Sequence, residues 1–270
     1  MAGERLCVIV YDSDAELDVR AAAPIVAELC RCSATDAALA LRRSVGIIAR
    51  DVPEGEAREA VARLGQAGVA AVCLAQEQNL GLPRAVLARA VQFDPRGLLC
   101  AEVYGGTRYE VPWGHVRAIV CGTVERQMGR KTKPPLWPLT ARVARAAGSL
   151  VGRAAAKPIE ELAGKPREIE LKETRLLASV AVADGGALHL RLEADRLDYS
   201  VLGEKRRVSA VDNFFAVLKA IAQRAPHALS NVPREELVGP RRPRAPQFPD
   251  THAMDLVAEW LLLRALAQER

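Results

Sequence analysis

Hydrophobic and polar positions in the first 80 residues alternate between two periods, and this alternation predicts a small mixed domain. Short apolar runs are typical of buried strands, whereas the spacing of Ile25, Val26 and Leu29 is typical of one helix face. Ser33 to Asp36 has the form of a capping box, and Pro53 followed by acids is a typical helix start. The predicted elements are a strand over 6–11, a helix over 19–30, a helix from 33, a strand over 45–52, a helix from 53 and a strand over 69–74.

After Pro83 the period changes to two, which predicts a β-rich domain over residues 84–225. Within the predicted strand 187–193, leucines alternate with His189, Arg191 and Glu193, so we expect one buried face and one solvent-exposed face. The predicted strands are 86–93, 98–104, 108–112, 116–124, 169–182, 187–193 and 197–201, and a helix over 212–225 follows them.

The C-terminal part of the chain contains a Pro-rich segment over 226–250, predicted to be a linker, and a last helix over 251–270. This helix is apolar on more than one side, so either its own β-rich domain or a partner must cover it. Together with the domains over 1–80 and 84–225, it predicts an α+β fold.

Two stretches resemble known families. The order β-α-α-β-α-β and the run GIIARDVPEGEAREAVARLGQAGVAAVCL, within residues 6–75, resemble the C-terminal domain of the bacterial ribosomal stalk protein and the related adaptor of the Clp protease system. Both families are protein-binding modules, so the resemblance implies an interaction role. The chain lacks the Lys-rich helix surface of the stalk family, and translation-factor binding is therefore not implied.

Residues 84–225 resemble a pleckstrin-homology-like barrel. The element order of four strands, an insertion, three strands and a helix carries this resemblance, together with the run GLLCAEVYGGTRYEVPWGHVRAIVCG. The barrel superfold binds peptides or lipids in its various members, so the resemblance implies a fold rather than a function.

The composition narrows the class of protein. Half of the 270 residues are hydrophobic, which is enough for a real core. No apolar run approaches the roughly 18 residues of a membrane span, so we expect a cytoplasmic protein. The six cysteines lie in apolar segments, and we expect buried free thiols without a disulfide framework.

The net charge of +5 is concentrated in one window. Residues 126–158 contain eight cations and no acid, and the rest of the chain has 30 cations and 33 acids, a net charge of −3. This window lies in the basic insertion over 126–166 and includes a possible amphipathic helix over 139–153. It is either a solvated loop or a surface for an anionic membrane or nucleic acid. Its candidate binding residues are Arg130, Lys131, Lys133, Arg142, Arg145 and Arg153.

Candidate catalytic chemistry is sparse. Asp12 and Asp14 follow an apolar strand, as the carboxylates of Mg²⁺-dependent phosphatases of the haloacid dehalogenase type do, but a helix cap or a turn is the commoner use of such acids. The thiols of Cys30 and Cys32 are badly spaced for one zinc ion. We interpret His189 as a surface residue on the solvent-exposed face of its strand. The sequence contains no P-loop or nucleophile-elbow motif.

The sequence therefore predicts a non-enzymatic protein-interaction or regulatory module, with a protein partner and no cofactor or metal. Two alternatives stay open: binding to an anionic membrane or nucleic acid through residues 126–158, and a Mg²⁺-dependent phosphatase that uses Asp12 and Asp14.

Overall fold

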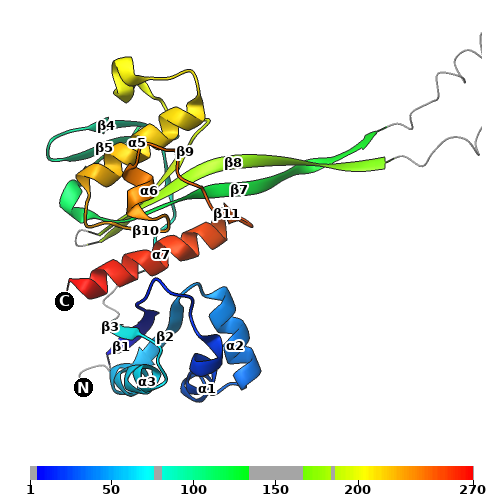
Figure 1. Cartoon of the computed structure of the whole chain (residues 1–270), viewed down its shortest axis with the longest axis vertical. Coiled ribbons are helices and arrows are strands. Elements are labelled where there is room, and N and C mark those ends of the chain that lie inside the picture. The colour runs from blue at the N-terminus through cyan, green and yellow to red at the C-terminus, as the bar shows by residue number, and fades with distance from the viewer. Residues whose placement is uncertain (1–4, 76–80, 134–166, 184–185, 270) are drawn as a thin grey trace, which may run out of the picture. The chain divides into compact units, whose positions relative to one another are not determined.

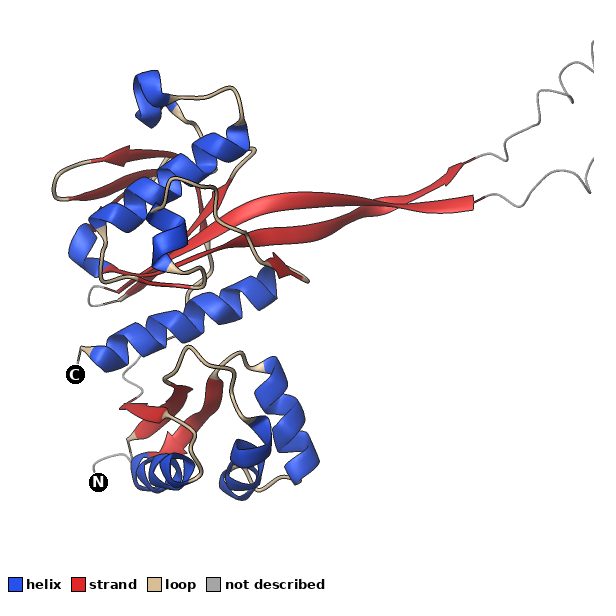
Figure 2. Ribbon diagram, viewed as in Figure 1, coloured by secondary structure: helices blue, strands red, loops and turns tan. Residues whose placement is uncertain are grey.

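The structure is a computed structural model that describes the backbone of residues 5–75, 81–133, 167–183 and 186–269, and the side chains of all of these except 126–133 and 167–172. It divides into two compact units, Met1–Val124 with Arg175–Arg270, and Glu125–Thr174. The described helices and the antiparallel and mixed sheets confirm the predicted α+β class (Figure 2). Among the described residues, no helix is long and apolar enough to cross a membrane.

The N-terminal region has the predicted order β-α-α-β-α-β. Its three strands form an antiparallel sheet in the order β2-β1-β3, so the first strand is central. The helices cover one face of this sheet, where Ile9, Ala22 and Leu64 share a buried core (Figure 1). The elements are β1 (Leu6–Tyr11), α1 (Val19–Leu29), α2 (Ala34–Arg43), β2 (Ile47–Pro53), α3 (Glu54–Gln66) and β3 (Ala71–Ala75).

Side-chain caps explain where these helices begin. The Ser33 hydroxyl accepts a hydrogen bond from the backbone N–H of Asp36 (3.1 Å) and donates one to the Asp36 carboxylate (2.7 Å). At α1, the Asp18 carboxylate accepts from two backbone N–H groups of the first turn. Both caps satisfy amides that have no partner within the helix, and the predicted N-termini of α1 and α2 are confirmed.

The β-rich region is one eight-stranded sheet in the order β10-β7-β8-β9-β4-β5-β6, with β11 also paired to β7. Two antiparallel groups, β8-β9 and β4-β5-β6, meet where β9 lies parallel to β4, and β7 lies beside β8. The first strands are β4 (Val86–Phe93), β5 (Gly97–Glu102), β6 (Arg108–Pro112), β7 (Val116–Lys133), β8 (Arg167–Ala183) and β9 (Ala187–Glu193).

The strand predicted over 197–201 is reduced to a single bridge between Asp198 and Ala90. The Asp198 carboxylate accepts a hydrogen bond from the backbone N–H of Ser200 (2.9 Å), which turns the chain instead of extending it. A 3-10 helix, η3 (Ser200–Lys205), and then α5 (Ala210–Arg224) follow.

The Pro-rich segment 226–250 contains regular structure: β10 (Leu229–Ser230), α6 (Arg234–Val238) and β11 (Gln247–Phe248). Both strands lie parallel to β7. Between them, the Asn231 amide accepts from the N–H of Cys121 and donates to its carbonyl, each at 2.9 Å. The segment therefore extends the edge of the large sheet at β7.

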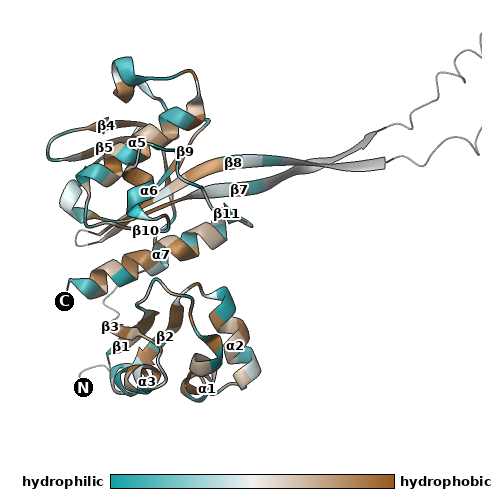
Figure 3. Ribbon diagram, viewed as in Figure 1, coloured by the Kyte–Doolittle hydropathy of each residue, from teal (hydrophilic) through white to brown (hydrophobic). Residues whose placement is uncertain are grey.

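The last helix, α7 (Thr251–Gln268), is buried on more than one side, and Figure 3 shows how much of it is hydrophobic. Met254 and Leu262 pack with Val120 and Leu177 of the large sheet. Leu263 packs with Val8, Val10, Ile47 and Leu74, on the face of the small sheet that α1 to α3 do not cover. The β-rich domain, one of the two expected covers, thus packs on this helix, and the small sheet packs on it as well, which the sequence analysis did not predict.

Both faces of the large sheet are consequently covered. Phe214 and Leu218 of α5 pack against Leu190 and Leu192 on one face of β9. The alternate residues of β9, His189 and Arg191, lie on the other face and are only 1% and 6% exposed. The prediction that this face is exposed to solvent is therefore wrong, because α7 and the segment before β4 cover it.

Candidate functional site

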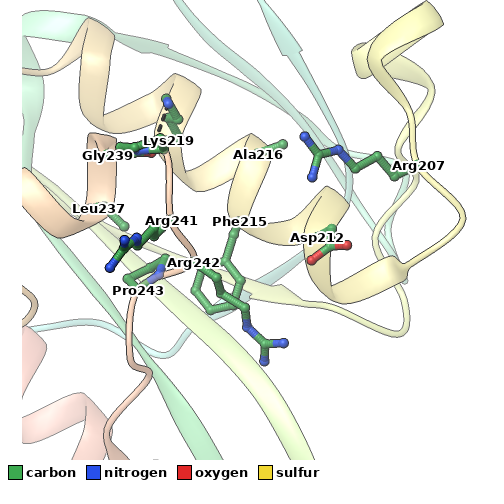
Figure 4. A pocket seen from close by; sticks show the side chains of 11 residues that line it. Arg207, Asp212, Phe215, Ala216, Lys219, Leu237, Gly239, Arg241, Arg242 and Pro243 are labelled. Atoms are coloured by element: carbon green, nitrogen blue, oxygen red, sulfur yellow. Dashed lines mark hydrogen bonds between the residues drawn. The ribbon is translucent and has the colours of Figure 1, made fainter.

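A basic groove of about 140 Å³ lies between α5 and the segment 237–243 (Figure 4). Asp212, Phe215 and Lys219 line it from α5, because residues three and four apart share one helix face. Leu237 and Pro243 line it from the other side. Both walls of the groove therefore contribute apolar side chains to its floor.

Two contacts fix cationic side chains of this groove. The Lys219 ammonium donates a hydrogen bond to the carbonyl of Gly239 (3.0 Å), which ties α5 to the opposite wall. The Arg242 guanidinium lies over the Phe215 ring, 5.2 Å from its centre, in cation–π geometry. Arg242 is thus held beside the apolar floor while its charge stays exposed.

The charges of the groove are unbalanced. Of the described residues that line it, Arg207, Lys219, Arg241 and Arg242 are cationic, and only Asp212 is acidic. Arg207, Arg241 and Arg242 are exposed, and none of them forms an ion pair with a described carboxylate. Figure 4 shows Arg207 and Asp212 near one end and Arg241 near the other, with Phe215 between them. The groove therefore presents uncompensated positive charge around an apolar centre.

These residues are not the basic residues that the sequence singled out. Arg130, Lys131 and Lys133 lie on β7, but their side chains are outside the described set. Arg142, Arg145 and Arg153 lie outside the described residues altogether. Binding through these six stays a prediction. The run PRRPR over 240–244 indicates the basic side of the groove. The sequence analysis interpreted it only as part of a Pro-rich linker.

Asp12 and Asp14 lie close together, but an arginine stands between them. Arg264 of α7 donates from Nε to Asp12 Oδ1 (2.8 Å) and from Nη1 to Asp14 Oδ1 (2.5 Å). The Arg264 side chain is 9% exposed, whereas that of Asp14 is 93% exposed. This arrangement favours a role for the two acids in neutralising a buried guanidinium, and the phosphatase alternative stays untested.

All six cysteines are free thiols, but they are not all buried as expected. Cys7, Cys100 and Cys121 are buried, and burial raises the pKa of Cys100 and Cys121 to about 12. Cys30 and Cys32 are exposed, because α1 ends at Leu29 and both lie in the turn before α2. The thiols of Cys100 and Cys121 are therefore protonated at neutral pH.

His189, expected at the surface, is buried beside charged groups. Its Nδ1 lies 3.2 Å from the carbonyl of Pro83 and its Nε2 lies 3.6 Å from Asp255 Oδ1. Burial, with the neighbouring Arg191, lowers its pKa from 6.5 to about 4. The ring is therefore neutral at neutral pH, and its contact with Asp255 is not an ion pair. The interpretation of His189 as a surface residue is therefore wrong.

This shifted pKa predicts a pH dependence of stability. Between pH 6.5 and about pH 4 the unfolded chain binds a proton at His189 that the folded protein does not. The free energy of unfolding should therefore decrease as the pH falls through this range, by up to about 1.4 kcal/mol per pH unit from this residue. Urea unfolding at several pH values measures it. His189→Phe should flatten the profile by that slope, and equal slopes in both proteins would refute the assignment.

Comparison with known proteins finds no matching family model, no similar curated protein and no similar solved structure. The resemblances to the stalk protein, the Clp adaptor and the pleckstrin-homology-like barrel therefore stay predictions from sequence patterns. The functional argument rests on the side chains themselves.

Proposed function

We propose that this protein is a non-enzymatic interaction module that binds an acidic segment of a partner protein in the basic groove. The observation that carries the proposal is the set of exposed arginines, Arg207, Arg241 and Arg242, which have no carboxylate partner among the described residues and surround the Phe215 ring. A peptide with carboxylates and an apolar side chain complements both features.

The distribution of charge favours a short acidic peptide over nucleic acid. Outside residues 126–158 the chain has a net charge of −3, so the chain as a whole offers a long polyanion no positive excess outside that window. Interactions between exposed charges are screened within about 8 Å at physiological salt. A short segment therefore interacts mainly with the arginines of the groove.

The groove is suited to binding rather than to catalysis. The described residues that line it include no serine, threonine, cysteine or histidine. Lys219, the one amine among them, is already bonded to the Gly239 carbonyl. The same bond keeps the two walls together, so the site is largely formed before a ligand arrives, which reduces the entropic cost of binding.

Fluorescence anisotropy with a labelled peptide of alternating glutamates and leucines tests the proposal on the full chain. We expect saturable binding that weakens as salt is added, and at least about tenfold weaker binding for Arg241→Glu with Arg242→Glu. The matched control is Arg42→Glu with Arg43→Glu, which changes the same charge at exposed positions of α2 and should bind as the wild type does.

Two further comparisons separate the groove from other basic surfaces. Changing Arg142, Arg145 and Arg153 to glutamine should leave peptide binding unchanged, because the proposal assigns binding to Arg207, Arg241 and Arg242. Single-stranded DNA of equal charge should bind no more tightly than the peptide. Equal losses in the groove and control variants, or tighter binding of DNA, would refute the proposal.

A further inference from the structure

The turn between α1 and α2 carries two exposed cysteines. All six cysteines lie in the part of the chain that the structure describes, and Cys30 and Cys32 are the exposed ones. Arg31 stands between them, and Ser33 begins the cap of α2 (Figure 1). Neither cysteine belongs to the buried hydrophobic clusters of the described residues or to the basic groove. Packing in the core therefore does not account for these two thiols.

Hydrogen bonds at the end of α1 fix the backbone around both cysteines. The N–H of Cys32 donates to the carbonyl of Ala27 (2.9 Å), and the N–H of Arg31 donates to the carbonyl of Glu28 (3.2 Å). This pair of bonds is a Schellman motif, which requires a left-handed residue and usually has glycine there. Arg31 occupies that position with φ +52°. The two cysteines therefore flank a turn of defined geometry.

The left-handed residue brings the two cysteine side chains to the same side. In a continuous α-helix, side chains two positions apart point toward nearly opposite faces. Here Cys30 has φ −89° and ψ 1°, and Arg31 has φ +52°. With a left-handed ψ of about 45° at Arg31, these angles place the cysteine Cα atoms about 5.3 Å apart and the Cβ atoms about 4.5 Å apart.

These separations suit a disulfide. Disulfides join residues with Cα atoms roughly 4.4–6.8 Å apart and Cβ atoms roughly 3.5–4.5 Å apart. The electrostatics agree, since partial burial and, after it, the nearby Cys32 thiol raise the pKa of Cys30. A bridge between Cys30 and Cys32 therefore needs side-chain rotation and little backbone movement.

Such a bridge would be easy to reduce. It closes one of the smallest loops that a disulfide can close, so it removes little conformational entropy from the unfolded chain and adds little stability. Exposed disulfides are also the labile ones, because a thiolate in solution reaches their sulfur atoms. The pair is therefore suited to reversible exchange rather than to a structural cross-link.

We propose that Cys30 and Cys32 form a reversible dithiol–disulfide site that exchanges with low-molecular-weight disulfides. One cysteine thiolate attacks a sulfur of the small disulfide, bonds to it and releases one small thiol. The other cysteine thiolate then attacks the protein sulfur of this mixed disulfide, closes the bridge and releases the second small thiol. The two cysteines lose two electrons and two protons, which reduce the small disulfide to two thiols. This chemistry is independent of the acidic segment proposed for the basic groove.

Glutathione redox buffers test this on the full-length protein. After equilibration, free thiols are alkylated with iodoacetamide, and the protein is digested with trypsin, which cuts after arginine. The reduced protein gives separate alkylated peptides 21–31 and 32–42, whereas the bridged protein gives one species over 21–42 without alkylation. We expect this joined species in the monomer band of a non-reducing gel. It should reach near-complete conversion in excess glutathione disulfide and disappear when reduced glutathione is restored.

Two comparisons separate this site from ordinary exposed thiols. Cys30→Ser removes the second thiol, so exchange should stop at a glutathione adduct on Cys32, at least about tenfold more abundant than in the wild type. In concentrated urea the turn is lost, and the bridge should require an at least about tenfold higher ratio of glutathione disulfide to reduced glutathione. A wild-type protein that accumulates adducts without the joined species, or a bridge that forms as readily in urea, would overturn the proposal.

Discussion

Replacing Leu263 with alanine is expected to lower the free energy of unfolding by about 2–5 kcal/mol. The Leu263 side chain is fully buried on α7, against Val8, Val10, Ile47 and Leu74 of the small sheet. Alanine would remove several methyl groups and leave a cavity that these strands cannot fill without breaking their pairing. Urea unfolding followed by circular dichroism measures the loss.

Two leucines serve as comparisons for this variant. Leu262 is equally buried but packs on the large sheet, so Leu262→Ala should cost a similar amount. Leu39 is 44% exposed on α2, and Leu39→Ala should change stability by less than about 0.5 kcal/mol. If Leu263→Ala costs no more than Leu39→Ala, α7 does not cover the small sheet in solution.

Replacing Gly46 with alanine should destabilise the protein by about 2–5 kcal/mol, for two separate reasons. Gly46 has φ +94°, where L side chains are strained, and an added Cβ would lie 2.5 Å from Nε1 of Trp260. That indole also donates a hydrogen bond to the carbonyl of Tyr11 (2.8 Å) and cannot move away without losing it. Chemical unfolding of the variant measures the sum of both effects.

A substitution at Gly68 separates the cost of backbone strain from the cost of steric overlap with a neighbouring side chain. It has φ +80° with no atom within 4 Å of an added Cβ, so Gly68→Ala reports the backbone strain alone and should cost about 1–2 kcal/mol. Combining Gly46→Ala with Trp260→Ala should cost less than the sum of the two, by about 1 kcal/mol or more. Additive costs in the double variant would mean that Trp260 does not occupy this position.

Most elements could be predicted from the sequence, because local signals determine them. The cap at Ser33, the acids after Pro53 and the period-two pattern of residues 187–193 act within a few residues of the element that they define. The strand predicted over 197–201 failed for an equally local reason, since the Asp198 carboxylate forms a turn that the apolar alternation does not register.

The sites could not be predicted, because residues far apart in the sequence form them. The alternation in β9 correctly separates its two faces, but it does not reveal that α7, about 60 residues later, covers the face with His189 and Arg191. Arg264 likewise reaches Asp12 across 252 positions. The basic groove joins α5 to a Pro-rich segment whose arginines the sequence interpretation assigned to a linker.

The most direct test of the acidic-segment proposal is a charge swap at the basic groove. Arg241→Glu with Arg242→Glu should lose the glutamate–leucine peptide and gain a lysine–leucine peptide of the same length, because the two substitutions reverse the sign of the net charge of the groove. Isothermal titration calorimetry of both proteins with both peptides gives the four affinities. The proposal predicts this reversal of preference, and an unchanged preference for the glutamate peptide in the reversed variant would contradict it.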